Sequence, residues 1–222
     1  MNFDSGRRPP RHLNAPAPWT GELDVRDATW GILSLPHPPS EVGTWSFEEV
    51  RGRLVQVSGE GTLTLATQLV VDAQRTGELA AWVCVQSDFY PPDVATSGVD
   101  LDSLVVVRVQ DARAAARAAD RLVRSGGFGL VVVDLTADAE FPLAVQSRLV
   151  GLAQRHEAAV VCLTRVSPED PSLSPLVSLR VHGRRARVAA GVFRCVLEPL
   201  RDKRRGTSWT FQKDYGGPAG VR

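Results

Sequence analysis

The loop at residues 58–65 has the layout of a phosphate-binding site. In the stretch RLVQVSGEGTLTLATQLVVDAQRTG (residues 53–77), an apolar strand is followed by a turn with Gly59 and Gly61 and then by a helix that starts at Thr62. In loops of the form GxxxxGK[ST], backbone N–H groups hold the phosphates, the lysine contacts the β and γ oxygens and the hydroxyl holds magnesium. The chemistry of such a loop is the binding of a nucleoside triphosphate.

The loop has no lysine in either register of this motif. If Gly59 is the first glycine, Leu65 stands in the place of the lysine, and if Gly61 is the second glycine, Thr62 does. The chain has only two lysines, both beyond residue 200. The loop is also too short to wrap a triphosphate. We therefore expect a tight turn between a strand and a helix, with no ATPase activity and no nucleotide cofactor.

Two further positions match the layout of a nucleotide hydrolase without its chemistry. Asp134 ends the apolar run LVVVD, where such enzymes place a magnesium-linked carboxylate. Because an Asp at the end of a buried strand is also a common turn former, we favour the structural role. Gln86 follows the run AAWVCV, where a hydrolase would place a water-activating glutamate, and an amide cannot take up a proton. We assign no catalytic residue.

The C-terminal half has one dense cationic run, RDKRRG at residues 201–206. It suits contact with DNA phosphates or with an acidic surface of a partner, and a solvated hairpin turn is the alternative. A second cluster, HGRRAR at residues 182–187, is expected on the same sheet edge, where the two clusters could make one basic face. The candidate residues for DNA or partner binding are Arg201, Lys203, Arg204, Arg205 and the aromatic anchor Trp209.

Composition narrows the functional classes. The net charge of +1 and the pI near 7.8 give no global attraction to nucleic acid or membrane. The four histidines have no ligand spacing, and Cys84, Cys162 and Cys195 stand far apart in apolar runs, so we expect reduced core cysteines and no metal site. No apolar run reaches the length of a membrane span, and no signal peptide is apparent, so we expect a cytoplasmic protein.

The elements that would position these residues alternate between strands and helices, which predicts a mainly parallel sheet flanked by helices, the α/β class. After residue 163 three strands follow without helices, which predicts an antiparallel extension on one sheet edge. The expected strands are residues 53–57, 80–85, 104–107, 130–134 and 158–163, then 177–182, 193–200 and 208–213. The expected helices are residues 62–75, 111–124 and 141–156, with a shorter one after Pro91 and Pro92.

The first 48 residues are rich in proline and hold isolated tryptophans at positions 19, 30 and 45. Proline at this density excludes long helices and central strands. We expect an extended N-terminal arm over residues 1–48 that docks on its own domain or on a partner, with docking on its own domain favoured. The core domain is expected over residues 49–216, and residues 217–222 as a flexible tail.

The order of motifs resembles a RecA-type recombinase core over about residues 50–216. The segments that carry the resemblance are GVDLDSLVVV (98–107), RSGGFGLVVVD (124–134), AVVCLTR (159–165) and LRDKRRG (200–206). The chain departs from the family in its phosphate loop and at Gln86. It also has Arg165 where the family has the glutamine that couples nucleotide to DNA. The DNA-binding loops are trimmed, and VSPEDPSLSP (166–175) is acidic and proline-rich.

Within the RecA-like superfamily, a short chain with a degenerate phosphate loop is most similar to ImuA. That resemblance implies a non-enzymatic adaptor in DNA-damage-induced (SOS) mutagenesis and translesion synthesis. It implies an inactive Y-family polymerase relative (ImuB-like) as a partner, with RecA as a further one. Weak DNA binding is expected separately, from the basic residues on the sheet edge. The alternatives are a DNA-binding RecA paralogue and a SulA-like cell-division inhibitor.

Overall fold

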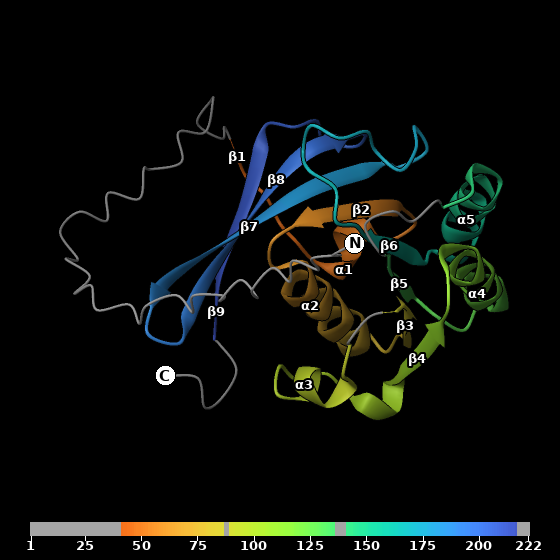
Figure 1. Ribbon diagram of the computed structural model, residues 1–222, viewed down its shortest axis with the longest axis horizontal. Helices are drawn as coiled ribbons and strands as arrows, with labels where there is room; N and C mark the ends of the chain where they lie inside the picture. The colour runs from red at the N-terminus through yellow and green to blue at the C-terminus, as the bar shows by residue number, and fades with distance from the viewer. Residues whose placement is uncertain (1–40, 87–88, 136–140, 217–222) are drawn as a thin grey trace, which may run out of the picture. The chain divides into compact units, whose positions relative to one another are not determined.

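A computed structural model describes residues 41–86, 89–135 and 141–216. Nine strands in this part of the chain form one sheet with the order β1-β9-β8-β7-β2-β6-β5-β3-β4 (Figure 1). The strands are β1 Glu41–Val42, β2 Leu54–Gly59, β3 Ala80–Val85, β4 Leu104–Val109, β5 Leu130–Asp134, β6 Ala159–Leu163, β7 Leu179–Ala189, β8 Val192–Asp202 and β9 Trp209–Gly216.

The pairing pattern confirms the expected fold class. Neighbouring strands in the part of the sheet that runs β7-β2-β6-β5-β3-β4 pair in parallel. By contrast, β7 pairs antiparallel with β8, and β8 pairs antiparallel with β9. The parallel strands were predicted to within two residues because they are short apolar runs buried on both faces. The antiparallel strands are longer than predicted, since β7 and β8 continue as a two-stranded ribbon through the exposed residues 185–190.

Helices cover both faces of the parallel strands (Figure 1). They are α1 Phe47–Val50, α2 Thr62–Arg75, α3 Pro91–Ala95, α4 Ala112–Ser125 and α5 Leu143–His156. Helix α4 begins where the Asp111 side chain accepts a hydrogen bond from the Ala114 N–H, and it ends at Gly126, whose φ is +71°. No helix in residues 41–86, 89–135 and 141–216 is long and apolar enough to cross a membrane.

Alternate residues of each central strand pack into two separate cores. Trp82 and Cys84 of β3 face the core covered by α1 and α2, whereas Ala81 and Val83 face the core covered by α4 and α5. This alternation follows from the two-residue period of a strand. The cores hold each strand in register, so the residues that follow the strands meet at one edge of the sheet.

The fold begins before the expected boundary at residue 48. Trp45 and Phe47 are 3% and 1% exposed, and the Trp45 indole N–H donates to the Leu65 carbonyl across 3.0 Å. Gly43 lies against the ring of Trp209 and donates its N–H to the Thr210 carbonyl. Trp45 therefore packs in the core of its own domain. The expectations for the tryptophans at 19 and 30, and for the tail, fall outside the described residues.

Candidate functional site

The carboxyl ends of β2, β5 and β6 meet at one edge of the sheet and surround a cavity of about 280 Å³. Ligand sites in open parallel sheets lie at this edge, and the volume is just under the usual range for small-molecule pockets, about 300–1,000 Å³. The structure therefore brings residues of the degenerate loop and Asp134 together. The residues that line the cavity are Gly59, Thr62, Asp134, Leu163, Thr164, Arg165, Val166 and Ser167.

The two loop glycines are required by packing against β7 and β8. Gly59 has a φ of +87°, and a Cβ on it would lie 2.2 Å from the Gly183 carbonyl oxygen. Gly61 has a φ of +74°, and a Cβ on it would lie 3.0 Å from the Cys195 sulfur. Both positions therefore admit glycine alone without strain. The glycines of the motif have a structural reason that involves no phosphate.

Glu60 lies between the two glycines and changes what the loop can bind. Its backbone N–H donates to the Gly183 carbonyl across 2.8 Å, so this amide is not available to a phosphate. Its carboxylate accepts a hydrogen bond from the Arg185 N–H across 3.3 Å. A carboxylate beside the start of α2 repels a phosphate instead of holding it. Glu60 was not among the expected site residues, although its position in SGEGT was visible in the sequence.

Asp134 faces an arginine at the place where a hydrolase would hold magnesium. Asp134 is 3% exposed, and its Oδ1 atom lies 3.7 Å from an Arg165 guanidinium nitrogen. Arg165 follows β6, the strand next to β5, which explains why the two side chains meet. The positive charge of the guanidinium offsets part of the charge of the buried carboxylate.

Gln86 follows β3 directly and has a φ of +45°, an uncommon backbone conformation for a residue other than glycine. Its side-chain amide donates to the Gln110 carbonyl at the end of β4 across 3.1 Å. This bond joins the ends of two neighbouring strands. Gln86 thus has a structural contact at the place where the resemblance puts a catalytic glutamate.

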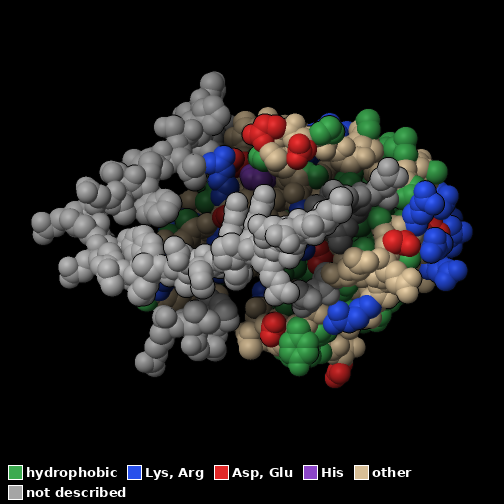
Figure 2. Space-filling view, viewed as in Figure 1, with side chains coloured by type: hydrophobic (Ala, Val, Ile, Leu, Met, Phe, Trp, Pro, Cys, Tyr) green, Lys and Arg blue, Asp and Glu red, His purple; other side chains and the backbone are tan. Residues whose placement is uncertain are grey.

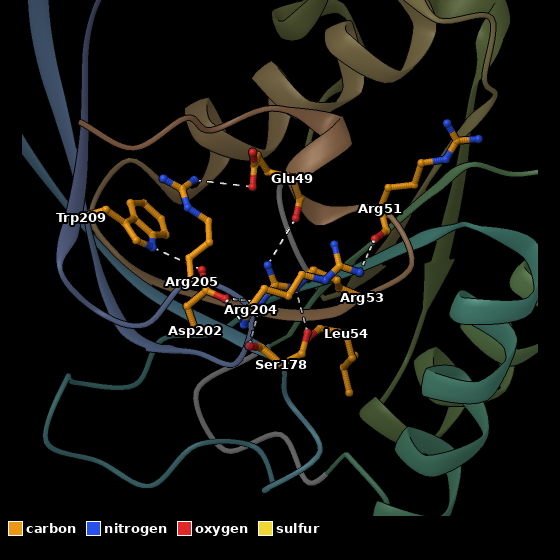
Figure 3. Close-up of polar contacts among 9 residues, drawn as sticks. All are labelled: Glu49, Arg51, Arg53, Leu54, Ser178, Asp202, Arg204, Arg205 and Trp209. Atoms are coloured by element: carbon orange, nitrogen blue, oxygen red, sulfur yellow. Dashed lines mark hydrogen bonds and ion pairs between the residues drawn. The ribbon is translucent and has the colours of Figure 1, made fainter. Parts of the chain in front are cut away.

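The cationic run at residues 201–206 starts in the last two residues of β8 and continues into the turn before β9, at the opposite end of the strands from the cavity. Figure 3 draws Asp202, Arg204 and Arg205 of this run. The Arg204 guanidinium donates to the Arg51 carbonyl, and Arg205 lies 3.5 Å from Glu49. Arg201 and Lys203 donate to carbonyls of the acidic segment, at Ser174 and Pro175. The four basic residues of the expected binding set therefore hold parts of this chain together. Their role toward DNA or a partner stays a prediction.

Trp209 is a core residue in this structure, not an exposed anchor. The side chain is 2% exposed, and its indole N–H donates to Asp202 across 3.2 Å. Asp202 in turn accepts a hydrogen bond from Arg53 across 2.6 Å, and both of these side chains are buried (Figure 3). The expectation that Trp209 inserts into a partner does not fit this burial, because the aromatic ring already fills a space beside β1.

The two basic clusters do not form one face. Arg201 pairs with Arg180 at the start of β7, whereas Arg185 pairs with Cys195 farther along the ribbon. Residues 195 and 201 of β8 are about 20 Å apart at the usual rise of a strand. The cluster at 182–187 therefore lies beside the degenerate loop, and the run at 201–206 lies at the other end of the strands. A local sequence cannot reveal which end of a ribbon a cluster occupies.

The three cysteines are buried and free, as expected. Burial raises the pKa of the Cys162 thiol to about 12, so this thiol stays protonated. In the described ranges, no three His, Cys, Asp or Glu side chains lie close enough together to hold a metal ion.

Residues 42–160 match the model of the RecA N-terminal domain. The chain is 34% identical over 147 residues to Protein RecA of Teredinibacter turnerae, covering 63% of this chain and 39% of that protein. It is 36% identical over 119 residues to Protein RecA of Methylococcus capsulatus, covering 47% of this chain and 34% of that protein. The chain thus spans between a third and two fifths of the length of these two curated relatives.

A solved structure also has this fold. The crystal structure of the RadB recombinase superposes with a TM-score of 0.57 at 20% identity, covering 73% of this chain and 87% of that chain. At this identity the likeness concerns the fold alone. It agrees with a mainly parallel sheet flanked by helices, extended by antiparallel strands.

Proposed function

The chain belongs to the RecA N-terminal domain family, and from this premise we propose that it is a non-enzymatic accessory protein of DNA-damage-induced mutagenesis. In this role a RecA-type fold serves as a binding scaffold, as the resemblance to ImuA implies. The partners would be an inactive Y-family polymerase relative and RecA itself. The observation that carries the proposal is the carboxylate of Glu60 in the loop where a RecA-type ATPase would bind phosphates.

Three contacts support the loss of nucleotide chemistry. The N–H of Glu60 is bonded to β7, Asp134 lies beside the Arg165 guanidinium, and Gln86 joins the ends of β3 and β4. No lysine precedes residue 203, so no ammonium group from this part of the chain can reach the β and γ phosphates. A protein that keeps the fold of an ATPase without these groups is suited to binding other macromolecules.

Calorimetry tests the lost ATPase chemistry. Titration of the full chain with ATP and magnesium at millimolar ligand is expected to give no saturable heat. The variant Asp134→Ala is the control, because Asp134 is the only carboxylate among the described residues that line the cavity. A micromolar dissociation constant for the wild type that is lost in Asp134→Ala would overturn the proposal.

Pull-downs test the adaptor role. The full chain is expected to retain the Y-family polymerase relative and RecA when each is supplied as a purified protein. Deletion of residues 1–40 keeps β1, Trp45 and the core, and deletion of residues 217–222 keeps β9, so loss of binding in either variant would locate the contact. If the full chain retained neither protein, the adaptor role would be contradicted.

A DNA-binding RecA paralogue is the second candidate function. A specific observation favours it, which is a row of exposed arginines on α4 at positions 113, 117, 121 and 124. The SulA-like alternative stays a prediction that no described contact tests.

A further inference from the structure

Helix α4 presents four arginines to solvent on one face. Arg113, Arg117 and Arg121 follow one another at intervals of four residues, and Arg124 comes three residues later. At 100° per residue these four side chains fall within one quarter of the helix circumference. All four are exposed. The opposite face of α4 is small and apolar and packs on the sheet through Ala115, Ala116, Ala119 and Val123.

Helix α5 extends this basic face. Arg148 and Arg155 are exposed on α5, and Figure 2 shows Lys and Arg side chains gathered over α4 and α5 on the right of the view. Asp120 joins the two helices, because it accepts hydrogen bonds from Arg124 at 2.7 Å and from Arg148 at 3.1 Å. Partial burial acts to raise the pKa of Asp120, but the two hydrogen bonds and the charges of both arginines together outweigh it and lower the pKa.

Three of the arginines have no acidic partner in the described part of the chain. Ion pairs occur at Arg124 and Arg148, both with Asp120, and none occurs at Arg113, Arg117 or Arg121. Like charges four residues apart destabilise a helix, and Arg113 lies in the first turn, where a cation is unfavourable. The arginine row therefore lowers the intrinsic stability of helix α4.

The chemistry of the face indicates its ligand. None of the large apolar side chains that are exposed in the described residues belongs to α4. Protein interfaces depend on buried aromatic and apolar anchors, so a face of arginine and alanine fits a protein partner poorly. A membrane-surface helix needs its apolar face free, and the apolar face of α4 is buried against the sheet. Arginine instead matches the bidentate geometry of phosphate oxygens.

We propose that the basic face of α4 and α5, formed by Arg113, Arg117, Arg121, Arg124, Arg148 and Arg155, binds the phosphate backbone of DNA without reading its sequence. From Arg113 to Arg124 the row is about 16 Å long, which is about five base steps of a duplex. The face belongs to the helices between β4 and β6, and it includes none of the residues that line the cavity and none of the run at 201–206. DNA binding by this face does not depend on which protein partner the chain has.

The test compares two triple variants of the full chain. Arg113→Gln, Arg117→Gln and Arg121→Gln together remove three charges from the face. Arg75→Gln, Arg194→Gln and Lys213→Gln together remove three charges from exposed positions elsewhere. Binding of labelled 30-nucleotide single-stranded and duplex DNA of random sequence is measured by fluorescence anisotropy between 50 and 200 mM salt. Circular dichroism checks that both variants are folded.

The expected result is a shallower salt dependence in the first variant alone. We plot the logarithm of the association constant against the logarithm of the salt concentration. The magnitude of the slope should be smaller by about three units for duplex DNA and by about two for single strands. The control variant should keep the wild-type slope. Equal slopes in the two variants, or no binding of either DNA by the wild type at 50 mM salt, would overturn the proposal. Binding of labelled polyglutamate but not of DNA, lost in the first variant, would overturn it in favour of an acidic protein partner.

Discussion

The guanidinium of Arg53 donates a hydrogen bond to the carboxylate of Asp202 across 2.6 Å, although the two residues are 149 positions apart in the chain. Both side chains are buried, at 2% and 1% exposure. Arg53 immediately precedes β2, and Asp202 is the last residue of β8. The pair therefore joins the parallel core to the antiparallel extension, and Figure 3 shows Trp209 and Ser178 beside it.

The first prediction concerns this buried pair. Arg53→Met should reduce the free energy of unfolding by about 3–5 kcal/mol, because it leaves a buried carboxylate without its cation. Asp202→Leu should have a similar effect. The double variant should lose less than the sum of the two, with a coupling of about 1–3 kcal/mol. Urea unfolding of the four proteins measures this coupling.

The exposed pair Arg194 and Asp214 is the control for the first prediction. The Arg194 guanidinium lies 2.7 Å from the Asp214 carboxylate, but both side chains are more than 40% exposed. Removal of either residue should change the midpoint of urea unfolding little, because water screens exposed ion pairs. If the buried pair shows no coupling, or no more than the exposed pair, its assigned role is wrong.

The second prediction concerns acid stability. Burial acts to raise the pKa of Asp202, but hydrogen bonds from the Arg204 N–H, Arg53 and Trp209, together with the charge of Arg53, outweigh it and lower the pKa. A lowered pKa in the folded state means that the stabilisation is complete above the pKa of the unfolded chain, about 3.9, and is lost as the pH falls through the folded value.

The measurement for the second prediction compares the wild type with Asp202→Asn. The wild-type free energy of unfolding should fall more steeply than that of the variant below about pH 4. At neutral pH the two curves should be parallel. Parallel curves over the whole acid range would show that Asp202 has an ordinary pKa. Other carboxylates with lowered pKa values contribute to both curves and cancel in the difference.

The third prediction concerns the glycine at the start of the degenerate loop. Gly59→Ala should reduce the free energy of unfolding by clearly more than about 1 kcal/mol, because the new Cβ would meet the Gly183 carbonyl oxygen in addition to the strain of a positive φ. Gly77→Ala is the matched control, since Gly77 has a φ of +85° and a Cβ added there would meet no atom within 4 Å. Equal losses in the two variants would refute the packing role of Gly59.

The sequence by itself determined the fold class and the state of the phosphate loop. Helix α2 was predicted with its observed bounds, because Gly61 precedes it and the apolar residues recur at helical spacing. Strands β3 and β5 were predicted with their observed bounds, because strands buried on both faces need continuous apolar runs. The missing lysine is a matter of residue identity, which folding does not change.

The sequence also contained a signal that was missed. The spacing RxxxRxxxR in α4 places three arginines on one face of any helix, but the net charge of +1 conceals a local patch. The exposed face of α4 could therefore have been predicted from periodicity. The place of Asp120 between two arginines on different helices could not, because it depends on how α4 packs against α5.

Only the tertiary structure decided which charges are already paired within the chain. The run at 201–206 looked free, but Arg205 lies beside Glu49 and Lys203 donates to Pro175, and these partners come from distant parts of the sequence. Trp209 looked like an anchor and is buried instead. The physical reason is that side-chain burial and ion pairing depend on which strands are neighbours, whereas local periodicity gives only the elements themselves.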